Sequence, residues 1–322
     1  MPHWLIKSAI HRVISWLPQS QVWNGLLQTY VTRSTAMTPQ TFEEKLEQCR
    51  RFLNFYRALR PGGEPFQVLE LGTGWFPTVP VGLYLCGAGN IWTIDIDPLL
   101  SPDRLRAMLQ FYCDYESSGV LKKFLPHYLP ARMEKIRALL AGCEGKSATE
   151  SLAHLNITVI VADAQRTPLP DASIDLFFSN GVLEYVPRPV LQGILKEFTR
   201  LSSADAVMVH RLNLVDQFSY FDRSITPFNF LKYTTDEWRW RNSPLIWQNR
   251  LRISDYRELL TSAGFEIAEE DNASGKAEDL AAVPLAPEFR HYSQADLLVL
   301  HSFITAKLPT GVRTPSLMRK PS

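Results

Sequence analysis

Apolar and polar positions switch between two periods along most of this chain, which predicts strands and helices in turn. Seven short apolar runs have the length of strands, and they lie at 66–71, 91–96, 157–161, 174–178, 206–210, 265–268 and 296–306. Helical patterns lie between them, at 78–86, 101–115, 131–141, 189–201 and 256–263. Because strands alternate with helices, we expect βαβ crossovers and a parallel sheet that is covered on both faces.

Two of the predicted helices carry start signals. Ser101-Pro102-Asp103 combines a cap, a first-turn proline and an acid at the positive end of the helix dipole. Ser254 is a candidate cap for the helix at 256–263, which stops at Gly264.

Four segments depart from this alternation and set the domain organisation. They are a helical N-terminal extension at 1–60, two insertions at 98–156 and 215–250, and a tail at 308–322 that we expect to be disordered. The rest of residues 61–307 then forms one domain. Although 322 residues are long enough for two domains, the pattern favours a single one.

The N-terminal extension is basic, with eight Lys or Arg against three acids in residues 1–60, whereas the remaining 262 residues carry four more acids than bases. Apolar positions between Trp4 and Leu17 recur at helical spacing, but this stretch is too short and too charged to span a bilayer. Two interpretations stay open: residues 1–17 lie on a membrane surface, or they pack on the main domain or a partner subunit.

Overall composition narrows the class of protein. The hydrophobic set makes up 45% of the residues and the net charge is +1, so no electrostatic case exists for a nucleic-acid partner. The four cysteines share no CxxC spacing, and no His, Asp or Glu cluster has ligand spacing. We therefore expect a cytoplasmic enzyme with reduced thiols and no metal.

The first candidate ligand-binding residues are Gly72-Thr73-Gly74, which follow the first predicted strand. Glycines in such a turn let the backbone approach a ligand closely, and ligands of open α/β sheets bind beyond the carboxyl ends of the strands. Asp95 ends the second strand 23 residues after Gly72, close to the spacing of an acid that binds a ribose diol. The pattern predicts a nucleoside-containing cofactor.

The identity of that cofactor follows from two further positions. A dinucleotide fingerprint would place a third glycine at position 77, which is Pro77. Glu70 stands two residues before the first glycine, where a carboxylate would repel a pyrophosphate and suit a cationic amino-acid group. Both features favour S-adenosylmethionine over a nicotinamide cofactor.

At this point the sequence resembles the class I S-adenosylmethionine-dependent methyltransferases, in the small-molecule, methyltransferase type 11-like branch. The resemblance covers about 66–307 and implies a Rossmann-like, seven-stranded, mostly parallel sheet with helices on both faces and an antiparallel last strand. The stretches that carry it are 70–74, 93–96, 162–164 with 169–175 behind it, and 179–186. One departure is Phe76, where many family members have glycine.

The resemblance also implies cofactor contacts, residue by residue. Glu70 and the backbone of Gly72, Thr73 and Gly74 would hold the methionine end. The remaining contacts would be Asp95 to the ribose, Ile96 to the adenine ring, Asp163 and Ala164 to the adenine edge, and Asn180 to the reacting centre. From the residues alone, the alternatives are that Asp95 caps the following turn and that Asp163 is a turn former.

Methyl transfer depends on alignment, and a base is needed only where the acceptor holds a proton near neutral pH. His210, at the carboxyl end of the fifth strand, is the first candidate base, and a hydrogen-bonded structural histidine is its alternative. Glu184 and Tyr185, just past the fourth strand, are further catalytic candidates that would border the substrate.

The insertion at 215–250 concentrates aromatic residues with arginines between them. It predicts a substrate pocket or lid, with a homodimer interface as the alternative; the aromatic residues are Phe218, Tyr220, Phe221, Phe228, Phe230, Tyr233, Trp238, Trp240 and Trp247. The sequence thus favours methyl transfer to an oxygen or nitrogen of a small metabolite, glycan precursor or natural product. The rival hypotheses are a nicotinamide-dependent enzyme of the same fold and a non-catalytic, cofactor-binding assembly protein.

Overall fold

Seven strands form one sheet in the order β3-β2-β1-β4-β5-β7-β6 in this computed structural model, which describes residues 4–5, 37–142, 145–242 and 247–309. All neighbours from β3 to β5 are parallel, and β7 is antiparallel to both β5 and β6. The predicted fold class, including the antiparallel last strand, is confirmed. The strands are β1 Val68–Leu71, β2 Ile91–Asp95, β3 Ile157–Val161, β4 Ile174–Asn180, β5 Ser202–Asn213, β6 Glu266–Ser274 and β7 Val299–Lys307.

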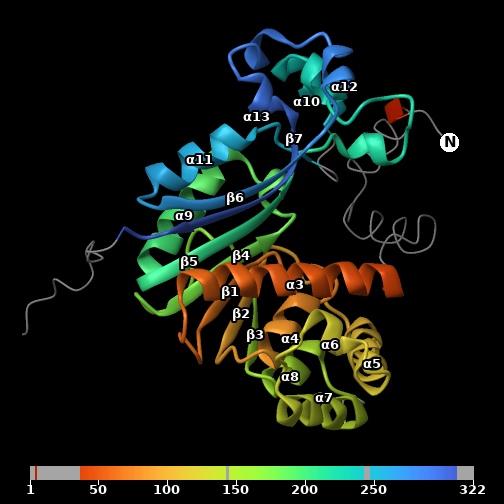
Figure 1. Ribbon diagram of the computed structural model, residues 1–322, viewed down its shortest axis with the longest axis vertical. Helices are drawn as coiled ribbons and strands as arrows, with labels where there is room; N and C mark the ends of the chain where they lie inside the picture. Colours follow the sequence, from red (N-terminus) through yellow and green to blue (C-terminus); the bar gives the residue numbers. More distant parts are fainter. Residues whose placement is uncertain (1–3, 6–36, 143–144, 243–246, 310–322) are drawn as a thin grey trace, which may run out of the picture.

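Helices cover both faces of the sheet (Figure 1). One face carries α3 and the helices of the first insertion, and the other carries α9 and α11. The helices are α3 Pro39–Leu59, α4 Thr78–Leu85, α5 Pro102–Ser117, α6 Leu121–Phe124, α7 Pro130–Gly142, α8 Ala148–Ala153, α9 Arg188–Leu201, α10 Thr235–Arg241, α11 Ile253–Ser262, α12 Ala277–Ala281 and α13 Gln294–Leu298.

Several predicted boundaries were wrong, and two of them have a local reason. The predicted helix at 256–263 begins earlier, because the Asp255 carboxylate accepts a hydrogen bond from the Arg252 backbone N–H at 2.7 Å and makes Arg252 the cap. Ser254, the predicted cap, lies inside the helix. The last strand begins only at Val299, because Ser293 accepts from the Asp296 N–H and caps the short helix α13.

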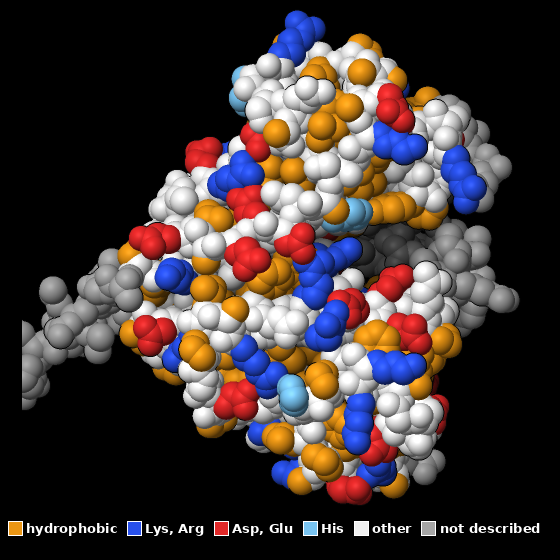
Figure 2. Space-filling view, in the orientation of Figure 1, with side chains coloured by type: hydrophobic (Ala, Val, Ile, Leu, Met, Phe, Trp, Pro, Cys, Tyr) orange, Lys and Arg blue, Asp and Glu red, His pale blue; other side chains and the backbone are white. Residues whose placement is uncertain are grey.

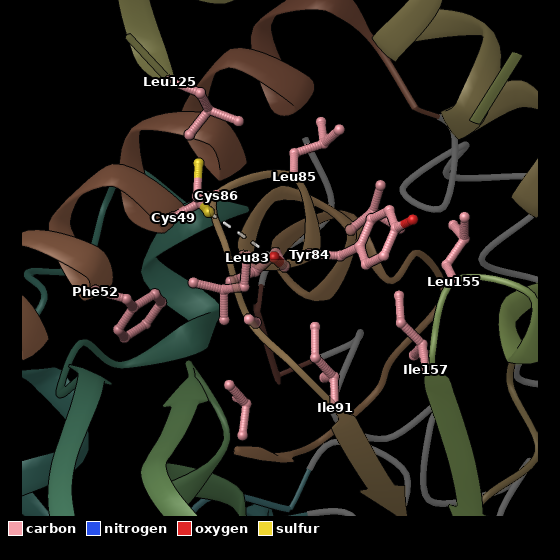
Figure 3. Packing of buried hydrophobic residues seen from close by; sticks show 14 of the residues in the cluster. Cys49, Phe52, Leu83, Tyr84, Leu85, Cys86, Ile91, Leu125, Leu155 and Ile157 are labelled. Carbon is pink, nitrogen blue, oxygen red and sulfur yellow. Dashed lines mark hydrogen bonds between the residues drawn. The ribbon is translucent and has the colours of Figure 1, made fainter. Parts of the chain in front are cut away.

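Helix α3 packs into the main core, so the second half of the predicted N-terminal extension lies against the sheet. The Phe52 ring lies 5.0 Å from Phe178 and 5.4 Å from Phe303, measured between ring centroids. Cys49 donates to the Val79 carbonyl at 3.8 Å, and a Cβ on Gly82 would come within 2.7 Å of its sulfur (Figure 3). This close approach fixes α3 against α4, next to the glycine turn. Residues 6–36 and 310–322, where the amphipathic stretch and most of the tail were predicted, lie outside the described residues.

Most of the aromatic residues of the second insertion form a small core of their own. Phe218, Phe228, Phe230 and Trp238 are at most 5% exposed and pack on one another and on residues between α12 and α13. These four side chains therefore fill a core, and the predicted pocket or lid and the homodimer interface stay predictions. Tyr220, Phe221 and Trp240 remain exposed. This third core forms the upper part of the molecule in Figure 1, above the ends of the parallel strands.

None of the helices within the described ranges combines the length and the apolar character needed to cross a bilayer.

Candidate active site

The turn after β1 has the backbone shape that only glycine adopts readily. Gly72 has φ of +88° and Gly74 of +62°. A Cβ on Gly72 would lie 2.4 Å from a methyl carbon of Val182, in the loop after β4, whereas a Cβ on Gly74 would meet nothing within 4 Å. The turn is therefore closely packed underneath and open above. An open glycine backbone at the carboxyl end of a parallel strand fits the methionine end of a bound cofactor.

Asp95 holds this turn from the end of the neighbouring strand. Its Oδ2 accepts from the Gly74 N–H at 2.9 Å, and its Oδ1 accepts from the Asp97 N–H at 3.2 Å. A carboxylate has about four acceptor positions, so two backbone bonds leave room for ribose hydroxyls. Asp95 therefore supports the turn, as its alternative interpretation held, and the ribose contact stays a prediction. Next to it, the apolar side chain of Ile96 is 76% exposed, as a platform for an adenine ring would be.

Glu70 lies beneath the turn and is 4% exposed. Its Oε2 accepts from Thr93 Oγ1 at 2.6 Å, and Thr93 Oγ1 also shares a 2.6 Å hydrogen bond with Thr73 Oγ1. Burial raises the pKa of Glu70 to about 8, although the Thr93 hydrogen bond and the charge of Lys45 oppose that shift. The carboxyl group is thus linked through two hydroxyls to the backbone turn that it was predicted to accompany.

Asp163 follows β3 and is exposed, while Ala164 beside it is buried. The carboxylate of Asp163 accepts from both the backbone and the side-chain N–H groups of Gln165, each at 2.9 Å. It forms a turn at the edge of the row of strand ends, and its contact with an adenine edge stays a prediction.

Asn180 is the last residue of β4, and it faces α3. Its Nδ2 donates to Gln48 Oε1 at 2.7 Å, whereas its buried Oδ1 has no hydrogen-bond partner among the described residues. Since β3, β2, β1 and β4 are neighbours in the sheet, their ends bring Asp163, Asp95, the glycine turn and Asn180 into one row.

Glu184 lies in a 3₁₀ turn, Leu183–Tyr185, and is 1% exposed. Burial raises the pKa of its carboxyl group to about 8, against nearby backbone N–H groups and the charge of Arg211. A Cβ on Gly181 would lie 3.4 Å from Glu184 Oε1 and 3.5 Å from Arg211 Nη1, so both groups flank that glycine. A carboxyl group with a pKa near 8 is suited to taking up a proton near neutral pH.

Tyr185, next in the chain, is 41% exposed. Asn249 holds the turn in place by donating to the carbonyls of Leu183 and Val186 at 2.8 and 2.9 Å. Tyr185 is therefore carried on a fixed turn with its side chain open to solvent, where a substrate could reach it.

His210 lies inside β5, because the strand continues to Asn213 instead of ending at His210 as predicted. Its side chain is 0% exposed and its Nδ1 lies 2.8 Å from Ser179 Oγ. Met208 and Leu212, two residues to either side, belong to the core under α9 and α11, so His210 points to that face. Burial lowers its pKa to about 4, which keeps the ring neutral. These observations favour the structural alternative over the base.

Two cations that the sequence did not place in the site lie near these groups. Lys45, on α3, and Arg211, on β5, are both half-buried. Burial and the charge of Arg211 lower the pKa of Lys45, while Glu70 and Glu184 oppose that shift. Lys45 therefore lies within electrostatic reach of both carboxyl groups. Figure 2 shows the surface hollowed between the upper part of the molecule and the part that carries α3, with Lys, Arg and His side chains at the edge.

Sequence reasoning missed Lys45, Gln48 and Asn249, and it used Arg211 only as a neighbour of His210. Lys45 and Gln48 lie three residues apart on one helix, so the polar face of α3 was a usable signal. Asn249 had no such signal, because its partners lie more than 60 residues away. Within the described ranges, no group of three or more His, Cys, Asp or Glu residues could hold a metal ion.

Part of the chain that forms this site matches a known family model. Residues 134–209 match the family model described as a methyltransferase domain, which confirms the resemblance seen in the sequence. The matched range includes Asp163, Asn180 and Glu184, and it ends one residue before His210. No curated protein sequence matches the chain.

Several solved structures are similar to this one at low identity. A chain of the Haloferax volcanii complex that contains the Trm112 methyltransferase activator is 16% identical, with a TM-score of 0.43, over 84% of this chain and 94% of that one. An S-adenosylmethionine-dependent methyltransferase from Mesorhizobium loti is 16% identical, with a TM-score of 0.40, over 81% and 99%. Geranyl diphosphate C-methyltransferase from Streptomyces coelicolor is 10% identical, with a TM-score of 0.45, over 81% and 75%.

Proposed function

We propose that this chain, which carries a methyltransferase-domain match on a seven-stranded sheet of that class, methylates an oxygen or nitrogen of a small molecule with S-adenosylmethionine as donor. A metabolite, a glycan precursor or a natural product is the acceptor class. The observation that carries the proposal is the junction of Gly74 and Asp95: an open glycine turn held at 2.9 Å by an acid from the next strand.

Residues around this junction would divide the cofactor between them. The Gly72–Gly74 backbone and Glu70 would bind the methionine end, Asp95 the ribose, Ile96 the adenine face, and Asp163 with Ala164 the adenine edge. When bound, S-adenosylmethionine supplies a methyl group activated by a positively charged sulfur. The protein would contribute alignment of the acceptor with that group, which by itself lowers the barrier substantially.

Glu184 is the residue that we assign to proton removal. It lies beyond the end of β4 near Arg211, and its raised pKa allows the carboxylate to take a proton from an acceptor hydroxyl or amine. Tyr185, exposed beside it, would contact the acceptor. His210 faces the core under α9 and α11 and would support the sheet through Ser179.

Calorimetric titration with S-adenosylmethionine and S-adenosylhomocysteine tests the cofactor site. We expect both to bind, and we expect Asp95→Ala to weaken binding at least about tenfold, because a charge-assisted hydrogen bond to the ribose is lost. Asp103→Ala, which removes an exposed acid on α5, is the matched control and should bind like the wild type. Failure of both ligands to bind would refute the proposal.

Incubation with S-adenosylmethionine labelled in its methyl group, across a panel of small alcohols, amines and enols, tests the transfer itself. Label recovered on an oxygen or nitrogen is the expected result, and label on carbon would correct the acceptor atom. Cofactor binding with no transfer to any acceptor would favour the assembly-protein hypothesis. A rise in melting temperature with NAD and none with S-adenosylmethionine would favour a nicotinamide enzyme.

A further inference from the structure

Lys45 and Arg211 differ from most half-buried cations of this protein in having no counter-ion. Arg60, Arg188 and Arg200 each pair with a carboxylate within 3 Å. Among the described residues, neither the Lys45 nor the Arg211 side chain has a hydrogen bond or an ion pair, although both residues are half-buried. Removing part of the water from a charge costs free energy that a partner normally offsets. Two such cations close together are a candidate binding site for an anion, because neither is needed for an ion pair within the fold.

The two cations lie together at one edge of the candidate site. Lys45 comes from α3 and Arg211 from the carboxyl-terminal part of β5, beside Gly181 and Glu184. Asn180 is the register partner of Arg211 and donates to Gln48 at 2.7 Å, and Gln48 lies one turn from Lys45 on α3. The two cations are therefore near neighbours, and the charge of Arg211 lowers the pKa of Lys45. Like charges in a partly desolvated place repel each other unless an anion lies between them.

The acids nearby do not supply that anion at neutral pH. Burial raises the pKa of both Glu70 and Glu184 to about 8, so each carboxyl group is largely protonated at pH 7. The hydrogen bond of Glu70 runs to Thr93 and not to Lys45. The cluster of four titratable groups therefore carries a net positive charge when no ligand is bound.

We propose that Lys45 and Arg211 bind an anionic group, a carboxylate or a phosphate, on the methyl acceptor. This rests on the proposed methyl transfer and narrows its acceptor class to anionic small molecules. A guanidinium group presents paired donors that match either anion, and an ammonium group adds a point charge that holds the same anion from α3.

The position of this pair explains the arrangement around it. Glu184 and Arg211 both lie beside Gly181. An acceptor whose anionic group is bound by Arg211 would therefore have its reacting hydroxyl or amine close to Glu184, the proposed base. Tyr185 and Tyr220 are 41% and 54% exposed, and Tyr220 reaches Asn213 at the end of β5. Their rings offer apolar surface for the part of the acceptor between its anion and its reacting group.

The test measures anion binding directly, with inorganic phosphate and acetate as probes. Each probe is titrated at constant ionic strength into the full-length protein, with and without S-adenosylhomocysteine, and the melting temperature is followed. Arg211→Met and Lys45→Met remove the two charges and keep much of the side-chain length. Arg106→Met and Lys122→Met, at exposed positions on α5 and α6, are the matched controls.

We expect phosphate, acetate or both to raise the melting temperature of the wild type and of the controls. The apparent affinity should fall about tenfold or more in Arg211→Met and Lys45→Met. A response to phosphate alone would identify the acceptor as a phosphate ester, and a response to acetate alone would identify it as a carboxylic acid.

Three results would overturn the proposal. One is a wild type that responds to neither anion, and another is an equal response in Arg211→Met. The third is a tenfold loss of S-adenosylhomocysteine affinity in both variants with no anion effect, because the pair would then hold the carboxylate of the cofactor. The anion titrations are also run without S-adenosylhomocysteine. They therefore test the anion site even if the cofactor fails to bind and the proposed function is refuted.

Discussion

The two halves of the candidate site are built in different ways. The cofactor half lies at the ends of β1, β2 and β3, and its main hydrogen bonds join two successive strands, with partners 20 to 23 residues apart, as Gly74 and Asp95 are. The acceptor half lies at the ends of β4 and β5, and it joins Lys45, Glu184 and Arg211 from three distant segments. Short sequence motifs are enough to identify the cofactor half, whereas the acceptor half is assembled only when the whole chain has folded.

The halves meet at Gly72, where the turn after β1 packs on Val182 from the loop after β4. Glycine at that position serves both halves, because it allows a positive φ on one side and a close approach on the other. Disturbing the contact should therefore affect cofactor binding and the loop that leads to Glu184 together. This point of contact gives the first and largest prediction.

Gly72→Ala should have the largest effect of any single change in the site. A Cβ 2.4 Å from Val182, added to φ of +88°, should lower the free energy of unfolding by about 4 kcal/mol through overpacking and backbone strain. Affinity for S-adenosylhomocysteine should fall as well. Urea unfolding and calorimetry measure the two effects. Gly119→Ala is the control, since its φ is +74° with nothing within 4 Å, so it tests strain without the clash.

Arg252→Met tests whether the segments that surround the acceptor half can be destabilised without an effect on the cofactor half. Arg252 is fully buried and donates to the carbonyls of Leu214, Leu297 and Val299, which lie directly after β5, in α13 and at the start of β7. Leaving three buried carbonyls without a donor should lower the free energy of unfolding by about 3 kcal/mol.

Affinity for S-adenosylhomocysteine should change less than twofold in folded Arg252→Met, because no cofactor contact is touched. An equal loss in both measurements would show that the two halves are not separable. Urea unfolding followed by calorimetry below the transition distinguishes these outcomes.

The same division explains what the sequence could predict. Gly72, Gly74 and Asp95 follow strands whose apolar runs are unmistakable, so their place at one sheet edge follows from the pattern. Lys45 could be placed on the polar face of its helix, but only the packing of α3 on the sheet brings it near Glu70. The seven-stranded, mostly parallel sheet and its antiparallel last strand came from the family resemblance and are confirmed, whereas the order of the strands was not predicted.

His210 and the aromatic insertion show where pattern reasoning fails in physical terms. Strand propensity did not show that β5 continues to Asn213, so His210 was placed at a strand end while its ring is buried against Ser179. Aromatic side chains can line a pocket or fill a core, and composition does not distinguish the two. Phe228 and Phe230 fill a core because α12 and α13 return to cover them.

Glu70 and Glu184 allow the halves to be compared through pH. In each case burial raises the pKa to about 8, above the usual value of an unfolded glutamate. Between about pH 4.5 and 8 the unfolded state has then lost a proton that the folded state keeps, so the free energy of unfolding falls as pH rises through that window. Glu70→Gln and Glu184→Gln should each make this fall shallower, and Glu266→Gln, at an exposed position on β6, should not.

The pH dependence of the turnover rate distinguishes Glu70 from Glu184, whereas the pH dependence of stability does not. In the wild type the rate should rise as pH increases toward 8, because the base form of Glu184 becomes populated. Glu184→Gln should lower the rate and remove this rise, whereas Glu70→Gln should keep the rise and change mainly the affinity for the cofactor. A pH profile unchanged in Glu184→Gln would remove it as the base.

Ile96→Ser should have the smallest effect and the most local one. The side chain is 76% exposed at the end of β2, so its loss removes little packing and the free energy of unfolding should stay constant. If adenine packs on it, the bound state loses about 1 kcal/mol of apolar contact, which is about a fivefold weaker affinity for S-adenosylhomocysteine. Leu129→Ser, also exposed, controls for a general effect of removing surface apolar groups. An affinity equal to that of the wild type would place the adenine elsewhere, and the cofactor half would then extend less far along the row of strand ends than its motifs predict.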